Sequence, residues 1–345
     1  MKIKLLLSAL ALGLSSVALA QDAAPLQISG SVDTYFKYDF SKTGNIKTFF
    51  ANEQNSISIG MIDLALKKTT GKASFVGELS FGPRGQSQSL PNAAGAYDET
   101  TNSFNIQNLY INYAFSDKFS MTAGYMGTFI GYEVISPAAN FNYSTSYLFG
   151  SGPFQNAGIK ASYTFSDKVS LMAGLFNDWN AYQDFNGVSH VGAQLTVSPV
   201  KGWTAYLNFL SGHSDGAPGT GTIFDLTTAY QITDKFKLGL NAADYNISGG
   251  NGGYSGVALY PQYAFTPAVA LGLRGEYFTY DIPAATSNPS VTSITLSANI
   301  KAGGLTFIPE VRFDNDKDFT QGFVKSNLSP TKSASQFSLA AVYAF

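Results

Sequence analysis

No cysteine occurs in the chain of 345 residues, and there are only two histidines, His190 and His213. The missing cysteines exclude disulfides, cysteine-ligated metals and thiol catalysis, and two histidines argue against a histidine-rich metal site. Charged residues are scarce as well, at 13%, about half of their usual share in soluble domains. Beyond residue 20, no apolar run approaches the ~18 residues that a membrane helix needs. We therefore expect no metal, no cofactor and no membrane-spanning helix.

The beginning of the chain has the pattern of a secretory signal peptide. Lys2 and Lys4 provide a positive start, a short apolar stretch follows, and an Ala-Leu-Ala cleavage pattern ends at Ala20. The apolar stretch is too short to cross a bilayer as a helix. We therefore predict that residues 1–20 are a signal peptide, cleaved on export through the inner membrane, and that residues 21–345 form one barrel domain.

Glycine and aromatic residues are abundant, with 34 Gly, 27 Phe and 20 Tyr, and apolar residues make up 45% of the chain. Without Lys2 and Lys4, 19 basic and 23 acidic residues remain, so the net charge of the mature chain is −4. This balance offers no basic surplus for a nucleic acid. An aromatic-rich, weakly charged chain without hydrophobic blocks is typical of a membrane β-barrel.

Large apolar residues alternate with small or polar ones along most of the mature chain. The segment "SITLSANI" (293–300), for example, sets Ile294 and Leu296 against Ser293 and Thr295. This period of two predicts half-buried strands, and no amphipathic helix interrupts it. The similar segments "YAFSDKFSMTAGY" and "YTFSDKVSLMAGL" each fit a strand, a tight turn and the next strand. Their irregular spacing argues against a solenoid repeat.

The breaks between strands alternate between two sizes. Seven short breaks and eight long, polar ones separate about sixteen strands of roughly 9–12 residues. We therefore predict an all-β fold, a transmembrane antiparallel β-barrel with short periplasmic turns, long extracellular loops and both chain ends on the periplasmic rim. A soluble β-sandwich is the alternative, but the even spacing and the Tyr/Phe enrichment favour the barrel. The short breaks lie near 68–72, 116–118, 166–168, 199–202, 233–235, 266–268 and 301–304, and the long ones near 41–55, 83–102, 129–155, 179–188, 213–221, 247–254, 281–290 and 315–334.

Two strand features carry separate expectations. Pro261 and Pro309 fall inside predicted strands, where each removes a backbone donor, so we expect β-bulges there.

The chain ends in "QFSLAAVYAF", with aromatic or apolar residues at alternate positions up to Phe345. This ending resembles the C-terminal signal by which outer-membrane barrels are passed to their assembly machinery. The alternative is a final strand that simply has an aromatic end.

The third long break, residues 129–155, is too apolar for an ordinary solvated loop. The lumen of a sixteen-stranded barrel is wide enough for a water channel, so we expect this loop to fold into the lumen and narrow it. The alternative is a loop that caps the rim or contacts a neighbouring subunit. Its large apolar and aromatic residues are Tyr132, Val134, Ile135, Phe141, Tyr143, Tyr147, Leu148, Phe149 and Phe154.

The segment "GYEVISPAANFNYSTSYLFGSGPFQNAGIKASY" (131–163) resembles the OmpL-like family of β-barrel porins. The resemblance extends, as a more generic barrel pattern, over nearly the whole mature chain. It implies an outer-membrane porin without catalytic residues. A basic residue is often expected where Thr145 stands, so the ion preference of the family does not carry over. The residues that carry the resemblance are Gly131-Tyr132-Glu133, Pro137, Asn140, Tyr143-Ser144, Ser146-Tyr147-Leu148-Phe149 and Gly152-Pro153-Phe154.

The alternation also predicts which charged side chains point into the lumen. Asp33 and Lys37 alternate away from Val32 and Phe36, and a charge on the lipid face costs ~2–4 kcal/mol near the midplane. The predicted pore-lining residues are Asp33, Lys37, Glu78, Lys160, Asp225, Lys237, Arg274, Glu276, Glu310 and Arg312 in the strands, with Tyr132, Glu133, Asn140, Tyr143 and Tyr147 in the loop.

These inward charges are mixed in sign, so their fields partly cancel and we expect weak ion selectivity. Glu133 is the expected constriction charge. The alternative is that the inner salt bridges only hold the wall together.

The sequence therefore predicts an outer-membrane porin for passive diffusion of small hydrophilic solutes or ions, and not an enzyme. One alternative is a non-conducting structural or adhesive barrel. Another is a hydrolase that uses His213 near Ser214 and Asp215, or His190 after Ser189, although neighbours in a glycine-rich loop seldom provide the required geometry. A gated transporter is not favoured, because we expect no plug domain before the first strand at Leu26. The expected partners are outer-membrane lipid and lipopolysaccharide, the assembly machinery and small solutes, with a homo-oligomer left open and no nucleic acid.

Overall fold

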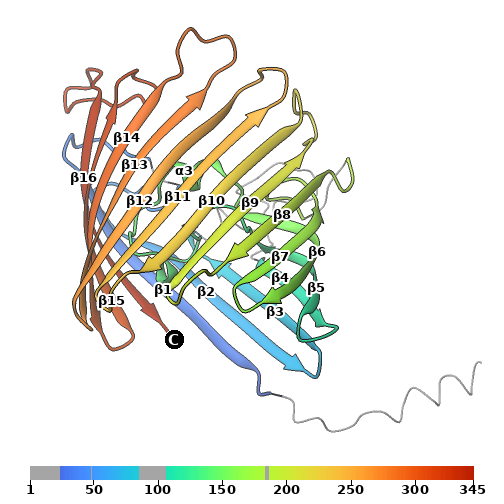
Figure 1. The fold of residues 1–345 in the computed structure, drawn as a ribbon. Helices are drawn as coiled ribbons and strands as arrows, with labels where there is room; N and C mark the ends of the chain where they lie inside the picture. Colours follow the sequence, from blue (N-terminus) through green and yellow to red (C-terminus); the bar gives the residue numbers. More distant parts are fainter. Residues whose placement is uncertain (1–23, 48, 85–105, 183–185) are drawn as a thin grey trace, which may run out of the picture.

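The computed structural model describes residues 24–47, 49–84, 106–182 and 186–345. Within these ranges, sixteen antiparallel strands pair in sequence order, and the first pairs with the last, so that the sheet closes into a barrel (Figure 1). The strands are β1 (Gln27–Asp39), β2 (Ser56–Thr70), β3 (Ala73–Phe81), β4 (Ile106–Ala114), β5 (Phe119–Gly127), β6 (Gln155–Ser166), β7 (Val169–Phe176), β8 (His190–Val197), β9 (Trp203–Gly212), β10 (Gly221–Gln231), β11 (Phe236–Ile247), β12 (Gly253–Thr266), β13 (Val269–Asp281), β14 (Ser290–Ala302), β15 (Leu305–Asp316) and β16 (Ser333–Ala344).

The alternation of short turns and long loops is confirmed. All seven short turns lie where the sequence predicted them, and glycines in the left-handed region, such as Gly71 (φ 57°) and Gly303 (φ 64°), form the two-residue turns after β2 and β14. The strands contain 8 to 15 residues, a wider range than predicted. Most of the predicted long break 83–102 lies outside the described residues.

The expected bulges at Pro261 and Pro309 are wrong. Both prolines lie inside continuous strands, and the register on either side of each is unchanged. Beside each proline, a few residue pairs are missing from the ladder with one of the two neighbouring strands. This strand is β13 for Pro261 and β14 for Pro309. A proline without a backbone donor is thus accommodated by a local interruption of one ladder and needs no extra residue.

The two faces of the wall differ as the alternation predicts. Apolar side chains such as Ile294, Leu296 and Leu273 are exposed on the outer face, whereas Ser293, Thr295 and their neighbours on the inner face are buried. An outward apolar band around a closed sheet is the requirement for a strand-built membrane protein. No helix among the described residues has the length and apolar character needed to cross a bilayer.

The first and last strands meet near the two ends of the described chain, at the rim that carries the short turns. The amide of Gly30 donates to the carbonyl of Phe345 at 3.0 Å, and the reverse bond is also 3.0 Å long. The predicted signal peptide, residues 1–20, lies outside the described part of the chain.

A charge on the outer face of the barrel should be costly. Leu296 lies at the middle of β14 and is 44% exposed, so Leu296→Arg is expected to lower the unfolding free energy in lipid vesicles by about 2–4 kcal/mol. The control is Val188→Arg, because Val188 is 65% exposed in the loop after β7 and should change stability by less than about 0.5 kcal/mol. Denaturant titration followed by tryptophan fluorescence measures both. Equal effects at the two positions would contradict a lipid-facing β14.

Candidate functional site

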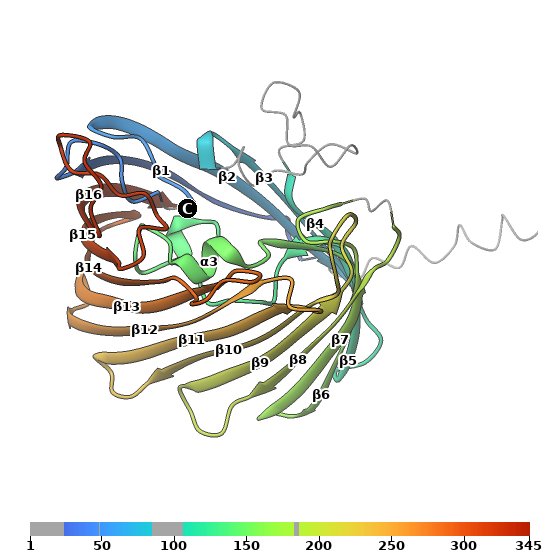
Figure 2. The ribbon, with the colours of Figure 1, turned by 90° about the horizontal axis from the view of Figure 1, so that it is seen from above.

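The third long loop, residues 128–154, folds into the barrel. It connects β5 to β6 and contains the short helices η1 (Pro137–Ala139) and α3 (Tyr147–Ser151). Figure 2 shows α3 inside the ring of strands. Within this loop, Ile130, Ile135 and Leu148 are buried, so the loop packs against the inner wall and does not cap the rim.

An apolar core fixes one side of this loop. Ile130 and Leu148 pack with inward-facing side chains of the wall, among them Phe176, Ile223 and Phe278. Burying a large apolar side chain completely contributes about 1.5–3 kcal/mol. The lumen is therefore only partly polar, since the wall is apolar where it packs against Ile130 and Leu148.

Two carboxylates of the wall bind the backbone of the loop. Glu310 accepts from the amides of residues 143 and 144 at 2.9 and 3.1 Å. Glu276 accepts from the amides of residues 147 and 148 at 3.0 and 2.8 Å. The second pair lies at the start of α3, whose first amides have no partner within the helix. Both carboxylates thus satisfy backbone donors that would otherwise be buried unpaired.

Arg274 joins the loop to β13 by a buried ion pair. Its Nη1 lies 2.6 Å from Glu133 Oε1 and donates to the carbonyl of Ser144 at 2.5 Å. The other oxygen of Glu133 accepts from the amide of Ser146 at 2.7 Å and from its hydroxyl at 2.5 Å. Arg274 therefore pairs with the loop and not with Glu276, its neighbour on the inner face of β13.

Arg312 supports the same stretch of the loop from β15. It pairs with Asp314, with Nε–Oδ1 at 2.8 Å and Nη2–Oδ2 at 3.0 Å, and its Nη1 donates to the carbonyl of Thr145 at 2.7 Å. The guanidinium also lies over the ring of Tyr147, 5.2 Å from its centroid. The carbonyl of Thr145 is thus held by two arginines of the wall, Arg274 and Arg312.

Two tyrosines of the loop donate to carboxylates of the wall. The hydroxyl of Tyr143 lies 2.5 Å from Asp33 Oδ2, and that of Tyr147 lies 2.7 Å from Asp314 Oδ2. Burial and, secondly, the neighbouring carboxylate raise the pKa of each phenol well above its ordinary value. Both phenols therefore stay neutral donors at any physiological pH.

Asp225 is satisfied without a cation. Its carboxylate accepts from the amide of Gly131 at 3.0 Å, from Asn208 Nδ2 at 2.7 Å and from Asn241 Nδ2 at 2.5 Å. Asp225 thus also holds the loop. Asn140, by contrast, closes a turn within the loop, since its side chain bonds the backbone of Val134 at 3.0 and 2.6 Å.

The remaining predicted charges lie on the inner face and make no hydrogen bond or ion pair with the described third loop. Lys37 donates to the carbonyl of Ile46 in the first long loop at 2.7 Å, and Glu78 accepts from Asn108 Nδ2. Lys160 and Lys237 are half-buried, and their ammonium groups make no hydrogen bond or ion pair within the described ranges. The structure therefore divides the predicted set into charges that hold the loop and charges that do not.

Arg84 is a contributor that the sequence did not indicate. It donates to the carbonyl of Ile135 at 3.0 Å and lies 4.5 Å from the ring centroid of Phe50 and 5.1 Å from that of Tyr143. Arg84 thus connects the first and third long loops. Arg84 lies just after the end of β3, where the alternation of the strand no longer predicts the direction of a side chain. The only sequence signal for its contact with the loops was the group of apolar residues around Phe50 in the first long loop.

The histidine clusters do not form a catalytic triad. Ser189 Oγ lies 2.7 Å from His190 Nδ1 and donates to Asp178 at 3.0 Å, and the same oxygen of Asp178 is 3.5 Å from Nδ1. A triad needs its acid and its nucleophile on opposite ring nitrogens, whereas both approach Nδ1 here. His213 is exposed, and its side chain makes no hydrogen bond to a described residue.

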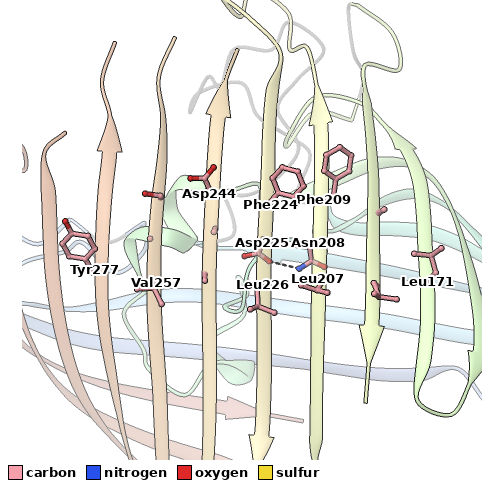
Figure 3. A pocket seen from close by; sticks show the side chains of 16 residues that line it. Leu171, Leu207, Asn208, Phe209, Phe224, Asp225, Leu226, Asp244, Val257 and Tyr277 are labelled. Carbon is pink, nitrogen blue, oxygen red and sulfur yellow. Dashed lines mark hydrogen bonds between the residues drawn. The ribbon is translucent and has the colours of Figure 1, made fainter. Parts of the chain in front are cut away.

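A hollow of about 700 Å³ belongs to the outer face (Figure 3). It lies over β7–β13 between Phe209, Phe224 and Tyr277. Phe224 is 59% exposed, whereas its neighbour Asp225 is 4% exposed and bonds the inner loop. The hollow is therefore a depression in the lipid-facing wall and not part of the lumen.

Removing one partner of the buried ion pair should leave the other unpaired. Arg274→Met is expected to lower the unfolding free energy by about 3–5 kcal/mol. In the double variant Arg274→Met/Glu133→Gln, the loss should fall short of the sum of the single losses by about 0.5–3 kcal/mol. Denaturant titration in detergent of the wild type, Arg274→Met, Glu133→Gln and the double variant measures this coupling. Strict additivity would show that the two residues act independently.

Comparison with known proteins agrees with this architecture. A family model described as "Putative beta-barrel porin-2, OmpL-like" matches residues 25–345. A search among curated proteins finds no match.

Several solved structures share the fold at low sequence identity. The outer membrane channel DcaP of Acinetobacter baumannii has a TM-score of 0.62 and 13% identity, covering 94% of this chain and 99% of its own. An anion-selective porin from Comamonas acidovorans has a TM-score of 0.60 and 13% identity, with 93% and 99% covered. OmpT of Vibrio cholerae, in a trimer form, has a TM-score of 0.59 and 12% identity, with 93% and 99% covered. Since the family model spans every strand of the barrel, the chain belongs to the OmpL-like beta-barrel porin-2 family of the outer membrane.

Proposed function

We propose that the chain forms a water-filled channel through which small hydrophilic solutes and ions diffuse passively across the outer membrane. The observation that supports this proposal best is a closed sixteen-stranded barrel with charged inner residues, narrowed by an infolded loop. A barrel of this size leaves room for a water channel beside such a loop. No observation favours a purely structural or adhesive barrel.

Within this proposal, the inner residues have two roles. Glu78, Lys160 and Lys237 face the water path, where charges of opposite sign keep selectivity weak. Tyr132 and Glu133 belong to the loop that forms the constriction. Glu133 is the acidic residue of this constriction, and its carboxylate is paired with Arg274. Lys37 bonds the first long loop, and Asn140 closes a turn within the third loop. The other members of the predicted set line the same passage but mainly hold the third loop: Asp33, Tyr143, Tyr147, Asp225, Arg274, Glu276, Glu310 and Arg312.

The proposed channel is not an enzyme. Family and fold support a transport role, and the cluster of Asp178, Ser189 and His190 lacks triad geometry. Among the described residues, no group of three or more His, Asp and Glu is placed to hold a metal ion.

The proposal includes the chain's path to the membrane and its partners there. Residues 1–20 act as a cleaved signal peptide for export through the inner membrane. The strand ending at Phe345 is passed to the barrel-assembly machinery, and lipid and lipopolysaccharide surround the outer face. A trimer form of the structural relative OmpT of Vibrio cholerae supports the proposal that this chain is a homo-oligomer.

Channel formation is tested by conductance across planar bilayers. We expect steady single-channel steps from the refolded protein and a reversal potential close to zero in a KCl gradient. Glu78→Gln should lower the K⁺/Cl⁻ permeability ratio a few-fold, and Lys160→Gln should raise it by a similar factor, because each removes one lumen charge. The control is Lys118→Gln in the exposed turn after β4. A folded barrel without steady conductance would establish the structural alternative instead.

The role of the last residue is tested by Phe345→Ala. The side chain of Phe345 is half-exposed, and its backbone bonds to Gly30 do not depend on it. We therefore expect much less folded protein in the outer membrane of cells, but refolding in detergent at the wild-type yield. Cell fractionation and detergent refolding distinguish the two effects. Equal losses in both would make Phe345 a residue needed for stability.

A further inference from the structure

A cavity of about 370 Å³ lies between the third loop and the inner face of β11, β12 and β14. The loop contributes Tyr132 and Asn142, and the strands contribute Lys237, Gln262 and Asn299. Lys237 is the second residue of β11, and Gln262 lies near the matching end of β12, so the cavity is on the short-turn side of the loop. Its volume falls in the range of small-molecule sites, about 300–1,000 Å³.

Only one of the two charges that line this cavity is unpaired. Glu133 is bound by Arg274 at 2.6 Å and by the amide of Ser146 at 2.7 Å. The ammonium group of Lys237 makes no hydrogen bond or ion pair within the described chain, and the side-chain amide of Gln262 beside it makes no hydrogen bond there either. The cavity therefore presents an unpaired ammonium and a free amide, which favour an anion with hydrogen-bonding oxygens.

The cavity also has a fixed aromatic wall. The rings of Tyr132 and Tyr260 stack, with centroids 4.5 Å apart and an angle of 24° between their planes. Tyr132 approaches the wall at Gly239, where a Cβ would lie 2.4 Å from its phenol oxygen. Asn142 and Asn299 are fixed by hydrogen bonds of 2.7 and 2.8 Å from their amide nitrogens. The site is thus pre-formed, and an aromatic surface and polar groups line the same cavity.

We propose that this cavity is a binding site for a small organic carboxylate with a flat or apolar carbon skeleton. Lys237 pairs with the carboxylate, Gln262 donates a hydrogen bond to it, and the skeleton packs on Tyr132. An inorganic anion would lack the third interaction, because it has no carbon skeleton to pack on Tyr132. The inference rests on the proposed channel function, in which such a solute would pause on its way past the loop, and it names a solute class for that channel.

The site is tested with benzoate as the probe. Isothermal titration calorimetry of the detergent-solubilised full chain measures binding without requiring conductance. We expect saturable binding of benzoate, at least ten-fold weaker binding of both benzamide and acetate, and at least ten-fold weaker benzoate binding by Lys237→Gln. Tyr132→Leu should weaken benzoate binding but leave acetate binding unchanged. The matched control Lys235→Gln removes an exposed charge from the same short turn and should bind benzoate like the wild type.

Equal binding of benzoate by the wild type and Lys237→Gln would overturn the proposal, as would equal binding of benzamide and benzoate. In planar bilayers, benzoate should also reduce the wild-type current more than that of Lys237→Gln. Benzoate binding by a barrel that does not conduct would support the site while refuting the proposed channel. Conductance without benzoate binding would support the channel while refuting the site.

Discussion

Closure of the sheet is the constraint on which every other feature of this protein depends. β1 and β16 pair from Ser31 with Ala344 to Asp39 with Gln336, although they lie at opposite ends of the chain. Hydrocarbon offers no hydrogen bonds, so an open edge would leave a row of backbone groups unpaired at a cost of several kcal/mol each. Because the closed sheet has an outside and an inside, every strand must alternate, and every second side chain is assigned to the lumen.

The lumen in turn determines how an apolar loop is held in place. A loop inside a barrel brings its own backbone donors and acceptors away from water. Glu276, Glu310 and Asp225 accept from its amides, and Arg274 and Arg312 donate to its carbonyls. Buried charges of this kind are tolerated only when they are fully hydrogen-bonded. These side chains therefore replace the hydration that the loop gives up.

This arrangement changes what the inner charges do to a passing ion. An arginine paired with a carboxylate, as Arg274 is with Glu133, contributes little unbalanced field. Lys160 and Lys237, which have no partner in the described part of the chain, keep theirs. The field felt by a solute thus follows from the unpaired groups and not from the sum of all inward charges, so a mixed composition is compatible with a local preference for an anion.

The sequence by itself determined the strands, the short turns, the inward position of the charges and the inward folding of the third loop, because alternation and turn chemistry are local. Only the tertiary structure decided that Phe176 and Ile223 pack against the infolded loop, that Arg274 pairs with Glu133 and not with Glu276, and that Arg84 contacts the loop. Alternation places a side chain on a face but does not say what it meets there. The ladders around Pro261 and Pro309 likewise depended on the neighbouring strand. Such contacts join residues far apart in the chain, 51 positions for Arg84 and Ile135 and 141 positions for Glu133 and Arg274, and follow from the path of the loop through the lumen.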